Sequence, residues 1–188
     1  MPTGYQIKDQ SAAYYLTFQV VFWIDLFSYA RYRDIIIDSL KFCQNDKGLE
    51  IFAWVIMSNH IHMLARSSKE DLSGTIRDFK KYTSKTVIEI IETCGDSRKE
   101  WMIRLFKHAA KRQNKAGSYQ VWTHENHAVE VYGNSFIQSK VDYIHHNPVR
   151  AGIVRRAEDY KYSSAGNYAG QEGLLDIIPV GSTWRTIR

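Results

Sequence analysis

Two hydrophobic periodicities alternate along the chain. Three stretches are rich in β-branched and aromatic residues and predict strands: residues 13–23 (AYYLTFQVVFW), 49–57 (LEIFAWVIM) and 60–66 (HIHMLAR). Only Ser58 and Asn59 separate the last two stretches, so these are expected to form a hairpin with a very short turn.

Apolar residues in the intervening segments recur at spacings of three and four, the pattern of a helix with one buried face. Helices are predicted over residues 30–46, 70–94 and 98–113. The buried face of the first would carry Tyr32, Ile36, Leu40 and Cys43. The buried face of the second would carry Leu72, Ile76, Phe79, Thr83, Val87 and Ile90.

The remaining part of the chain is expected to hold a short strand at 119–122, then a loop and a late helix. Ser135 and Gln138 fit a capping box that would open this helix. The residue before a proline avoids the α region, so the Asn147–Pro148 pair is expected to end the helix just after residue 146.

The order of these elements predicts an α+β fold. Strand, helix, strand, strand and helix, followed by a late strand, suit a ferredoxin-like antiparallel sheet with helices packed on one face. Such a sheet leaves its other face open for a ligand. There is no internal repeat, low-complexity segment or proline-rich linker, so one domain is expected over residues 1–188, with an extended tail after about residue 170.

Composition indicates a globular protein, because 44% of the residues are hydrophobic and 13% are aromatic. No apolar run approaches the ~18 residues of a membrane span, and no signal peptide is evident, so a cytoplasmic, nucleoid-associated protein without a membrane partner is expected. Cys43 and Cys94 lie in helical patterns without metal-type spacing, which predicts two reduced, buried thiols. The net charge of +5 is compatible with a nucleic-acid partner.

The first candidate site is the pair His60 and His62. Residues i and i+2 of a strand point to the same side, with Cβ atoms about 6–7 Å apart, so both imidazoles can bind one metal ion while Ile61 enters the core. Two ligands cannot complete a coordination shell, so a third is required. The alternative interpretation is two surface or hydrogen-bonded histidines at the start of a strand.

The second candidate site lies in VDYIHHNPVRAGIV, residues 141–154. His146 and Asn147 follow Tyr143 by three and four residues, which places all three on one helix face. The alternative is an amphipathic tyrosine with polar residues at a helix end. Together with the histidine pair, however, these residues suggest a single active site, in which a divalent cation polarises a phosphate and a tyrosine acts as covalent nucleophile.

Basic residues form two stripes. In the predicted helix 70–94, Arg77, Lys81 and Lys85 recur every four residues, with Lys80 adjacent. A second group comprises Lys99, Arg104, Lys107, Lys111, Arg112 and Lys115, with the aromatic residues Trp101 and Phe106 among them. Cationic stripes bind phosphates and exposed aromatic rings stack on unpaired bases, although an ordinary solvated face is an equally simple interpretation of each stripe.

These motifs resemble those of a known family. WVIMSNHIHMLAR resembles the histidine–hydrophobe–histidine motif of single-tyrosine transposases, and YIHHNPVRAGIV resembles the segment with the catalytic tyrosine in the REP-associated tyrosine transposases. The helix segment IRDFKKYTSK and the later EDYKYSSAGNYAG are also similar, so the resemblance runs from about residue 13 to about residue 170.

The resemblance implies a ferredoxin-like fold and a metal-dependent transposase or nickase that acts on single-stranded DNA. His60, His62 and Asn147, or His146 in place of Asn147, would bind Mg²⁺ or Mn²⁺. Tyr143 would attack a phosphodiester beside a hairpin or imperfect palindrome, leaving a 5′-phosphotyrosine link and a free 3′-hydroxyl that permits rejoining.

Other functions remain open at this point. One is a non-catalytic, domesticated relative that only binds nucleic acid, and another is a metal-dependent hydrolase of small phosphoesters. The residues do not distinguish a monomer from a homodimer. A role near the site for His124 and His127, in the loop THENHAVE, is a further hypothesis, although simple loop structure is the commoner interpretation.

Overall fold

The computed structural model describes residues 6–114 and 117–181. Its centre is a four-stranded antiparallel sheet in the order β2-β3-β1-β4, formed by Tyr14–Gln19 (β1), Leu49–Ile56 (β2), His60–Ser67 (β3) and Val129–Glu130 (β4). The helices of the fold are Ala30–Lys47 (α1), Leu72–Thr93 (α2), Lys99–Arg112 (α3), Asn134–Arg150 (α4) and Ala165–Tyr168 (α5), with short 3-10 turns at Val21–Trp23 (η1), Leu26–Ser28 (η2) and Ala157–Asp159 (η3).

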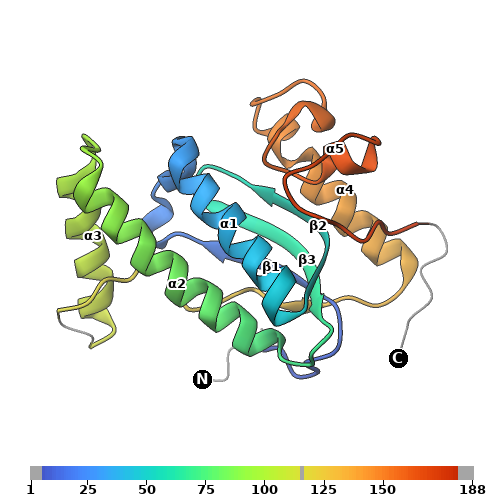
Figure 1. Cartoon of the computed structure of the whole chain (residues 1–188), viewed down its shortest axis with the longest axis horizontal. Helices are drawn as coiled ribbons and strands as arrows, with labels where there is room; N and C mark the ends of the chain where they lie inside the picture. The colour runs from blue at the N-terminus through green and yellow to red at the C-terminus, as the bar shows by residue number, and fades with distance from the viewer. Residues whose placement is uncertain (1–5, 115–116, 182–188) are drawn as a thin grey trace.

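Helices α1 and α2 lie across one face of the sheet (Figure 1). Their apolar stripes enter the core as predicted, except that Ile90 is only half-buried and its neighbours Ile88 and Ile91 are buried instead. The largest side chains that are completely buried come from β1, β2, η2, α1 and α3: Trp54, Tyr14, Tyr32, Phe18, Phe27, Phe52 and Phe106. Helix α4 contacts β2 and β3, and its Tyr143 ring lies 5.3 Å from the His62 ring.

Within the described residues, no helix combines the length and apolar character that a membrane crossing requires. Both cysteines are free, and Cys43 is buried, but Cys94 is only half-buried, so the prediction of two buried thiols is correct for one of them. Residues 171–181 contain no helix or strand. They contact β2, where the Ile178 amide donates to the Ile51 carbonyl over 2.9 Å. The first five and last seven residues of the predicted domain, and Lys115, lie outside the described residues.

The first strand is shorter than predicted. It ends at Gln19, and the chain then turns through η1, where Phe22 and Trp23 both have φ of 56°. The predicted strand at 119–122 is also wrong, because that segment makes only an isolated bridge between Val20 and Trp122. The late strand is instead β4, which pairs with Tyr14 and Tyr15 of β1.

Helix α4 does not end at the Asn147–Pro148 pair, as the sequence suggested, but continues through Pro148 to Arg150. Pro148 is buried in the last turn, where packing outweighs the one backbone hydrogen bond that a proline removes. The predicted capping box is absent too. Gly133 is the N-cap residue, and Gln138 donates to Asp142 within the helix.

Candidate functional site

His60 and His62 project from the same face of β3, and their ring centroids are 4.6 Å apart. The strand periodicity predicted this arrangement, and Ile61 is fully buried between them on the opposite side. His62 is buried, with 6% of its surface exposed, whereas His60 is half-buried at the end of the strand. The pair therefore sits at the rim of the sheet face that carries His62.

Each imidazole is held through its Nδ1 atom. The His60 Nδ1 lies 2.7 Å from the Asn59 side-chain oxygen, which can only accept, so this nitrogen carries the proton. The His62 Nδ1 lies 2.8 Å from the Tyr15 hydroxyl and 3.0 Å from the Thr17 hydroxyl, both on β1. Partners of this kind at one ring nitrogen orient the other, Nε2, toward a metal ion.

Burial keeps both histidines neutral at physiological pH. It lowers the pKa of His60, and it lowers the pKa of His62 to about 3, with smaller contributions from His60, Arg150 and Lys140. The neutral imidazole is the form that binds a metal ion. The pair thus has the protonation state and the outer hydrogen bonds of a ligand pair.

The Tyr143 ring completes a row of three aromatic rings. Its centroid lies 5.3 Å from that of His62, and 41% of its surface is exposed. Arg150 folds back over it, because the guanidinium carbon lies 4.4 Å from the ring centroid and Nη2 donates to the Tyr143 carbonyl over 2.9 Å. Tyr143 is therefore both accessible from solvent and placed beside a fixed positive charge.

Tyr143, His146 and Arg150 line a shallow depression on the outer surface of α4. His146 is exposed, and its Nδ1 donates to the Asp142 carbonyl one turn earlier over 2.9 Å. His145 belongs to a different side of the helix. It is buried with its Nε2 2.8 Å from the Ser164 hydroxyl, and burial lowers its pKa to about 4.

A divalent ion at the histidine pair would need a third ligand, for which the sequence offers the Asn147 amide oxygen or the His146 ring. Among residues 6–114 and 117–181, no three His, Cys, Asp or Glu side chains cluster as a metal site would require. Asn147, one turn after Tyr143, has a buried Nδ2 atom that finds no hydrogen-bond partner within the described residues. This nitrogen is a hydrogen-bond donor and cannot bind a cation, so an ion would have to be held by the Oδ1 atom of the same amide. The choice between Asn147 and His146 stays a prediction.

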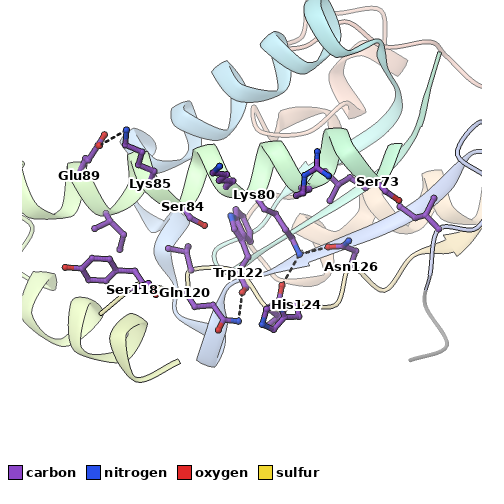
Figure 2. Close-up of a pocket in the computed structure, with 18 of the residues that line it drawn as sticks. Ser73, Lys80, Ser84, Lys85, Glu89, Ser118, Gln120, Trp122, His124 and Asn126 are labelled. Atoms are coloured by element: carbon purple, nitrogen blue, oxygen red, sulfur yellow. Dashed lines mark hydrogen bonds and ion pairs between the residues drawn. The ribbon is translucent and has the colours of Figure 1, made fainter. Parts of the chain in front are cut away.

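The basic stripe of α2 forms one wall of a groove whose other wall is residues 118–126 (Figure 2). Arg77 and Lys85 are strongly exposed, with 74% and 77% of their side-chain surface accessible, and Lys81 is also exposed. Lys80 differs from them. Its Nζ donates to the Thr123 carbonyl over 2.9 Å and to the Asn126 side chain, as Figure 2 shows, and burial lowers its pKa to about 8.

Of the second stripe, Lys107, Lys111 and Arg112 are exposed on α3, and the Lys107 ammonium lies 5.5 Å from the Tyr119 ring centroid. Trp101 is partly exposed, but Phe106 is fully buried and cannot stack on a base. His124 lines the groove of Figure 2, and His127 pairs with Glu125 over 3.9 Å. None of these contacts decides whether the stripe meets DNA, so its role stays a prediction.

Sequence reasoning missed three kinds of residue near the histidines. Tyr15 and Thr17 approach His62 only through the pairing register of β1 and β3, which the sequence does not reveal. Arg150 follows Tyr143 by seven residues, a spacing that returns to the same helix face. The sequence predicted that the helix ends before Arg150, so this contact was not expected. Asn59 is recognisable in the sequence as a residue of the hairpin turn, but its contact with His60 is not.

Known proteins resemble this chain in sequence and in fold. Residues 25–147 match the family model described as "Transposase IS200 like". A REP-associated tyrosine transposase of Escherichia coli (strain K12) is 25% identical over 123 residues, 64% of this chain and 57% of the relative, so the chain spans little more than half the length of that curated relative.

A solved structure, described as a REP-associated tyrosine transposase bound to a REP hairpin, matches with a TM-score of 0.60. It covers 99% of both chains at 18% sequence identity, which is a likeness of fold. The expected α+β fold, with an antiparallel sheet and packed helices, is thereby confirmed.

Proposed function

The chain belongs to the IS200-like transposase family, and from that premise we propose that it is a single-stranded DNA strand transferase with Tyr143 as its nucleophile. The observation that carries this proposal is the 5.3 Å contact between the Tyr143 ring and the His62 ring. It joins an accessible phenol from α4 to a histidine pair from β3, two motifs about eighty residues apart in the chain. A protein that only bound DNA would not require that contact.

The proposed reaction transfers a DNA end to the protein and back. Tyr143 gives up its phenolic proton and its oxygen bonds to phosphorus, while the bond from phosphorus to the 3′ oxygen breaks. That oxygen takes up a proton and becomes a free 3′-hydroxyl, and the 5′ side remains linked to the tyrosine. Attack by another 3′-hydroxyl reverses the step and joins two strands without consuming ATP.

The residues around Tyr143 suit this reaction. Arg150 places a planar guanidinium over the phenol ring, where it can pair with a phosphate and stabilise the negative charge that develops on the oxygens. Lys140 lies on the same side of the sheet, with its ammonium 4.7 Å from the Tyr15 ring centroid. Both cations favour an approaching phosphodiester.

A divalent ion, Mg²⁺ or Mn²⁺, would be held by His60, His62 and Asn147, or by His146 in place of Asn147. When bound, it would polarise the phosphate and neutralise charge in the transition state. The protein's own contribution is to keep both imidazoles neutral and oriented, through Asn59 on one ring and Tyr15 with Thr17 on the other.

The proposed substrate is single-stranded DNA with a hairpin or palindrome next to the cleaved bond. The solved relative is bound to a REP hairpin, and this chain presents the exposed cations Arg77, Lys81 and Lys85 along one groove. His60, His62 and Tyr143 meet within one chain, so a monomer has all three residues of the proposed site. A homodimer is also compatible with the proposal.

Covalent trapping tests the proposal. Single-stranded hairpins from the DNA that flanks the gene are incubated with Mn²⁺ and the protein, and the products are separated on a denaturing gel. The wild type should give a protein–DNA band that disappears in excess EDTA and in Tyr143→Phe. Tyr132→Phe is the matched control, because Tyr132 is exposed just before α4 and should give the band unchanged.

A different result would favour other functions. Tight hairpin binding that Tyr143→Phe leaves intact, with no covalent band from the wild type, would favour the non-catalytic binding module. A band that survives EDTA would remove the metal from the proposal and leave the nucleophile. Turnover of small phosphoesters that is insensitive to charge reversal at Lys81 and Lys85 would favour the hydrolase.

A further inference from the structure

The turn η1 carries two exposed aromatic residues in an unfavourable backbone conformation. Phe22 and Trp23 both have φ of 56°, the left-handed region that bulky side chains rarely adopt. Their exposed surface fractions are 41% and 60%, so burial of these rings does not compensate for the strain. Strain of this kind in ordinary globular proteins gathers at functional sites, where the surrounding contacts hold it in place.

The contacts that hold this turn lead directly to the histidine pair. The Asn59 side-chain nitrogen donates to the Trp23 carbonyl over 3.4 Å and to the Asp25 carboxylate over 3.0 Å. The oxygen of the same amide accepts from the His60 Nδ1 over 2.7 Å. One carboxamide therefore fixes both the position of the turn and the orientation of a proposed metal ligand.

Trp23 also extends the row of rings at the site. Its ring centroid lies 6.2 Å from that of His60, which lies 4.6 Å from His62, which in turn lies 5.3 Å from Tyr143. The indole stands at the opposite end of the row from the nucleophile, on the same side of the sheet. A DNA strand whose phosphate meets Tyr143 and the histidines would bring an adjoining base to Trp23.

The far side of the turn faces one fixed cation, Arg112, in a depression that Glu125 also lines. Phe22 lies 5.9 Å from the ring of His108 on α3, and it lines a depression together with Arg112 and His124. Arg112 is exposed at the end of α3, so a phosphate that follows the stacked base would meet a positive charge. Aromatic rings that alternate with cations are the usual arrangement of sites for single-stranded nucleic acid.

We propose that Trp23 is a stacking platform for one unpaired base next to the phosphodiester that Tyr143 attacks, and that the strand continues from there toward Arg112. The inference rests on the proposed strand-transferase function and adds to it the position of a nucleobase site. Stacking does not read hydrogen-bond patterns, so this site would hold the strand in register for cleavage with little preference for base identity.

The test combines Trp23 variants with DNA that lacks single bases. A series of hairpin substrates carries one abasic position each along the unpaired segment, with the sugar-phosphate backbone intact. For wild type, one abasic position should weaken binding about 10-fold, the effect of losing one aromatic–base stack. Trp23→Ala should lose about the same 10-fold on intact DNA and should lose nothing further at that one position, whereas Trp23→Phe should keep most of the affinity.

Two further variants separate a functional from a structural role. Trp23→Gly should not lower the Tm, because glycine adopts positive φ without strain, yet it should bind DNA as weakly as Trp23→Ala. Phe42→Ala removes an equally exposed aromatic residue from α1 and should bind all substrates as the wild type does. Equal losses at every abasic position in Trp23→Ala and in wild type would overturn the proposal.

Binding and covalent trapping together test the nucleobase site and the strand-transferase activity separately. A covalent band from wild type, with Trp23→Ala equal to wild type in binding and cleavage, would refute the stacking platform and leave the strand transferase intact. Absence of the band from every variant, with the single-position loss still present in binding, would refute the strand transferase and support the nucleobase site.

Discussion

The Tyr15 hydroxyl lies 2.8 Å from the His62 Nδ1, and the Thr17 hydroxyl lies 3.0 Å from the same atom. Thr17 is the direct cross-strand partner of His62, and Tyr15 precedes it by two residues, on the same side of β1. Burial raises the pKa of Tyr15, so its hydroxyl stays protonated and remains a hydrogen-bonding group. Two side chains of one strand thus orient a single ring nitrogen of the next.

This shared arrangement predicts a non-additive effect on metal binding. Either Tyr15→Phe or Thr17→Val leaves one hydroxyl at the His62 Nδ1, so each should raise the Mn²⁺ concentration for half-maximal trapping less than about 3-fold. The double variant leaves none and should raise it at least about 10-fold, the usual effect of removing an outer-sphere partner. A Mn²⁺ titration of the covalent band measures this directly.

The control for this pair is Tyr168→Phe, which removes the hydroxyl of a half-buried tyrosine that donates to the Phe52 carbonyl and accepts from the Val180 amide. It should change the Tm without changing the Mn²⁺ requirement. Should the two single variants already show the full effect of the double variant, the hydroxyls act as one chain of hydrogen bonds and not as alternatives.

The third ligand is testable in the same titration. Asn147→Ala should raise the Mn²⁺ concentration for half-maximal trapping at least about 10-fold, because it removes the amide oxygen that is proposed to bind the ion. His146→Ala removes an exposed ring whose Nδ1 donates to the Asp142 carbonyl of its own helix, and it should keep the Mn²⁺ requirement within about 2-fold of wild type. The reverse result would assign the ligand to His146.

Arg150 should act on the rate of cleavage and not on metal binding. Arg150→Gln removes the guanidinium above the Tyr143 ring and should slow covalent trapping roughly 100-fold, as the loss of one transition-state donor does. Arg150→Lys should recover only part of the rate, because an ammonium lacks the planar fork that matches a phosphate. Arg155→Gln, an exposed arginine shortly after α4, is the control. Equal rates in Arg150→Gln and Arg155→Gln would exclude the role.

If DNA binds in the groove of Figure 2, the salt dependence of hairpin affinity should change when one of its cations is replaced. Lys81→Glu should weaken hairpin binding and make the slope of log affinity against log salt shallower by roughly 1, because about one phosphate contact is lost. Lys41→Glu, on an exposed position of α1, changes the net charge equally and should leave the slope unchanged. An unchanged slope in Lys81→Glu as well would place the DNA elsewhere on the molecule.

The sequence predicted the parts of this site that depend on local periodicity. A period of two placed His60 and His62 on one side of a strand, and a period of 3.6 placed the buried residues of α1 and most of those of α2. It did not predict the contacts that depend on strand register. Neither Tyr15 nor Thr17 is recognisable as a partner of His62 until β1 and β3 are aligned.

The errors near the end of the chain have a different cause. Local rules treat proline as a helix end, but the burial of Pro148 in α4 outweighs that preference and brings Arg150 over Tyr143. The segment around Trp122 has the composition of a strand, yet its indole nitrogen donates to Thr83 of α2 over 2.9 Å, so packing against a helix replaces sheet pairing. Tertiary contacts overrode local preference in both places.

A buried ion pair away from the site should control acid stability. The Asp96 carboxylate accepts hydrogen bonds from the Tyr32 hydroxyl over 2.7 Å and from the Arg98 side chain over 3.0 and 3.1 Å, between the ends of α1, α2 and α3. Burial of the carboxylate opposes its ionisation, but these hydrogen bonds outweigh that effect and lower the pKa of Asp96 to about 2. The folded state thus favours the charged form.

Because the pKa is lower in the folded than in the unfolded protein, Asp96 stabilises the fold fully above about pH 4 and loses this contribution as the pH falls toward 2. Asp96→Asn should lower the free energy of unfolding by about 2 kcal/mol at pH 7. In thermal melts, the difference in Tm between Asp96→Asn and wild type should shrink steadily between pH 4 and pH 2. Asp38→Asn, at an exposed position of α1, should have the Tm of wild type throughout. A difference independent of pH would mean that shape, and not charge, makes Asp96 stabilising.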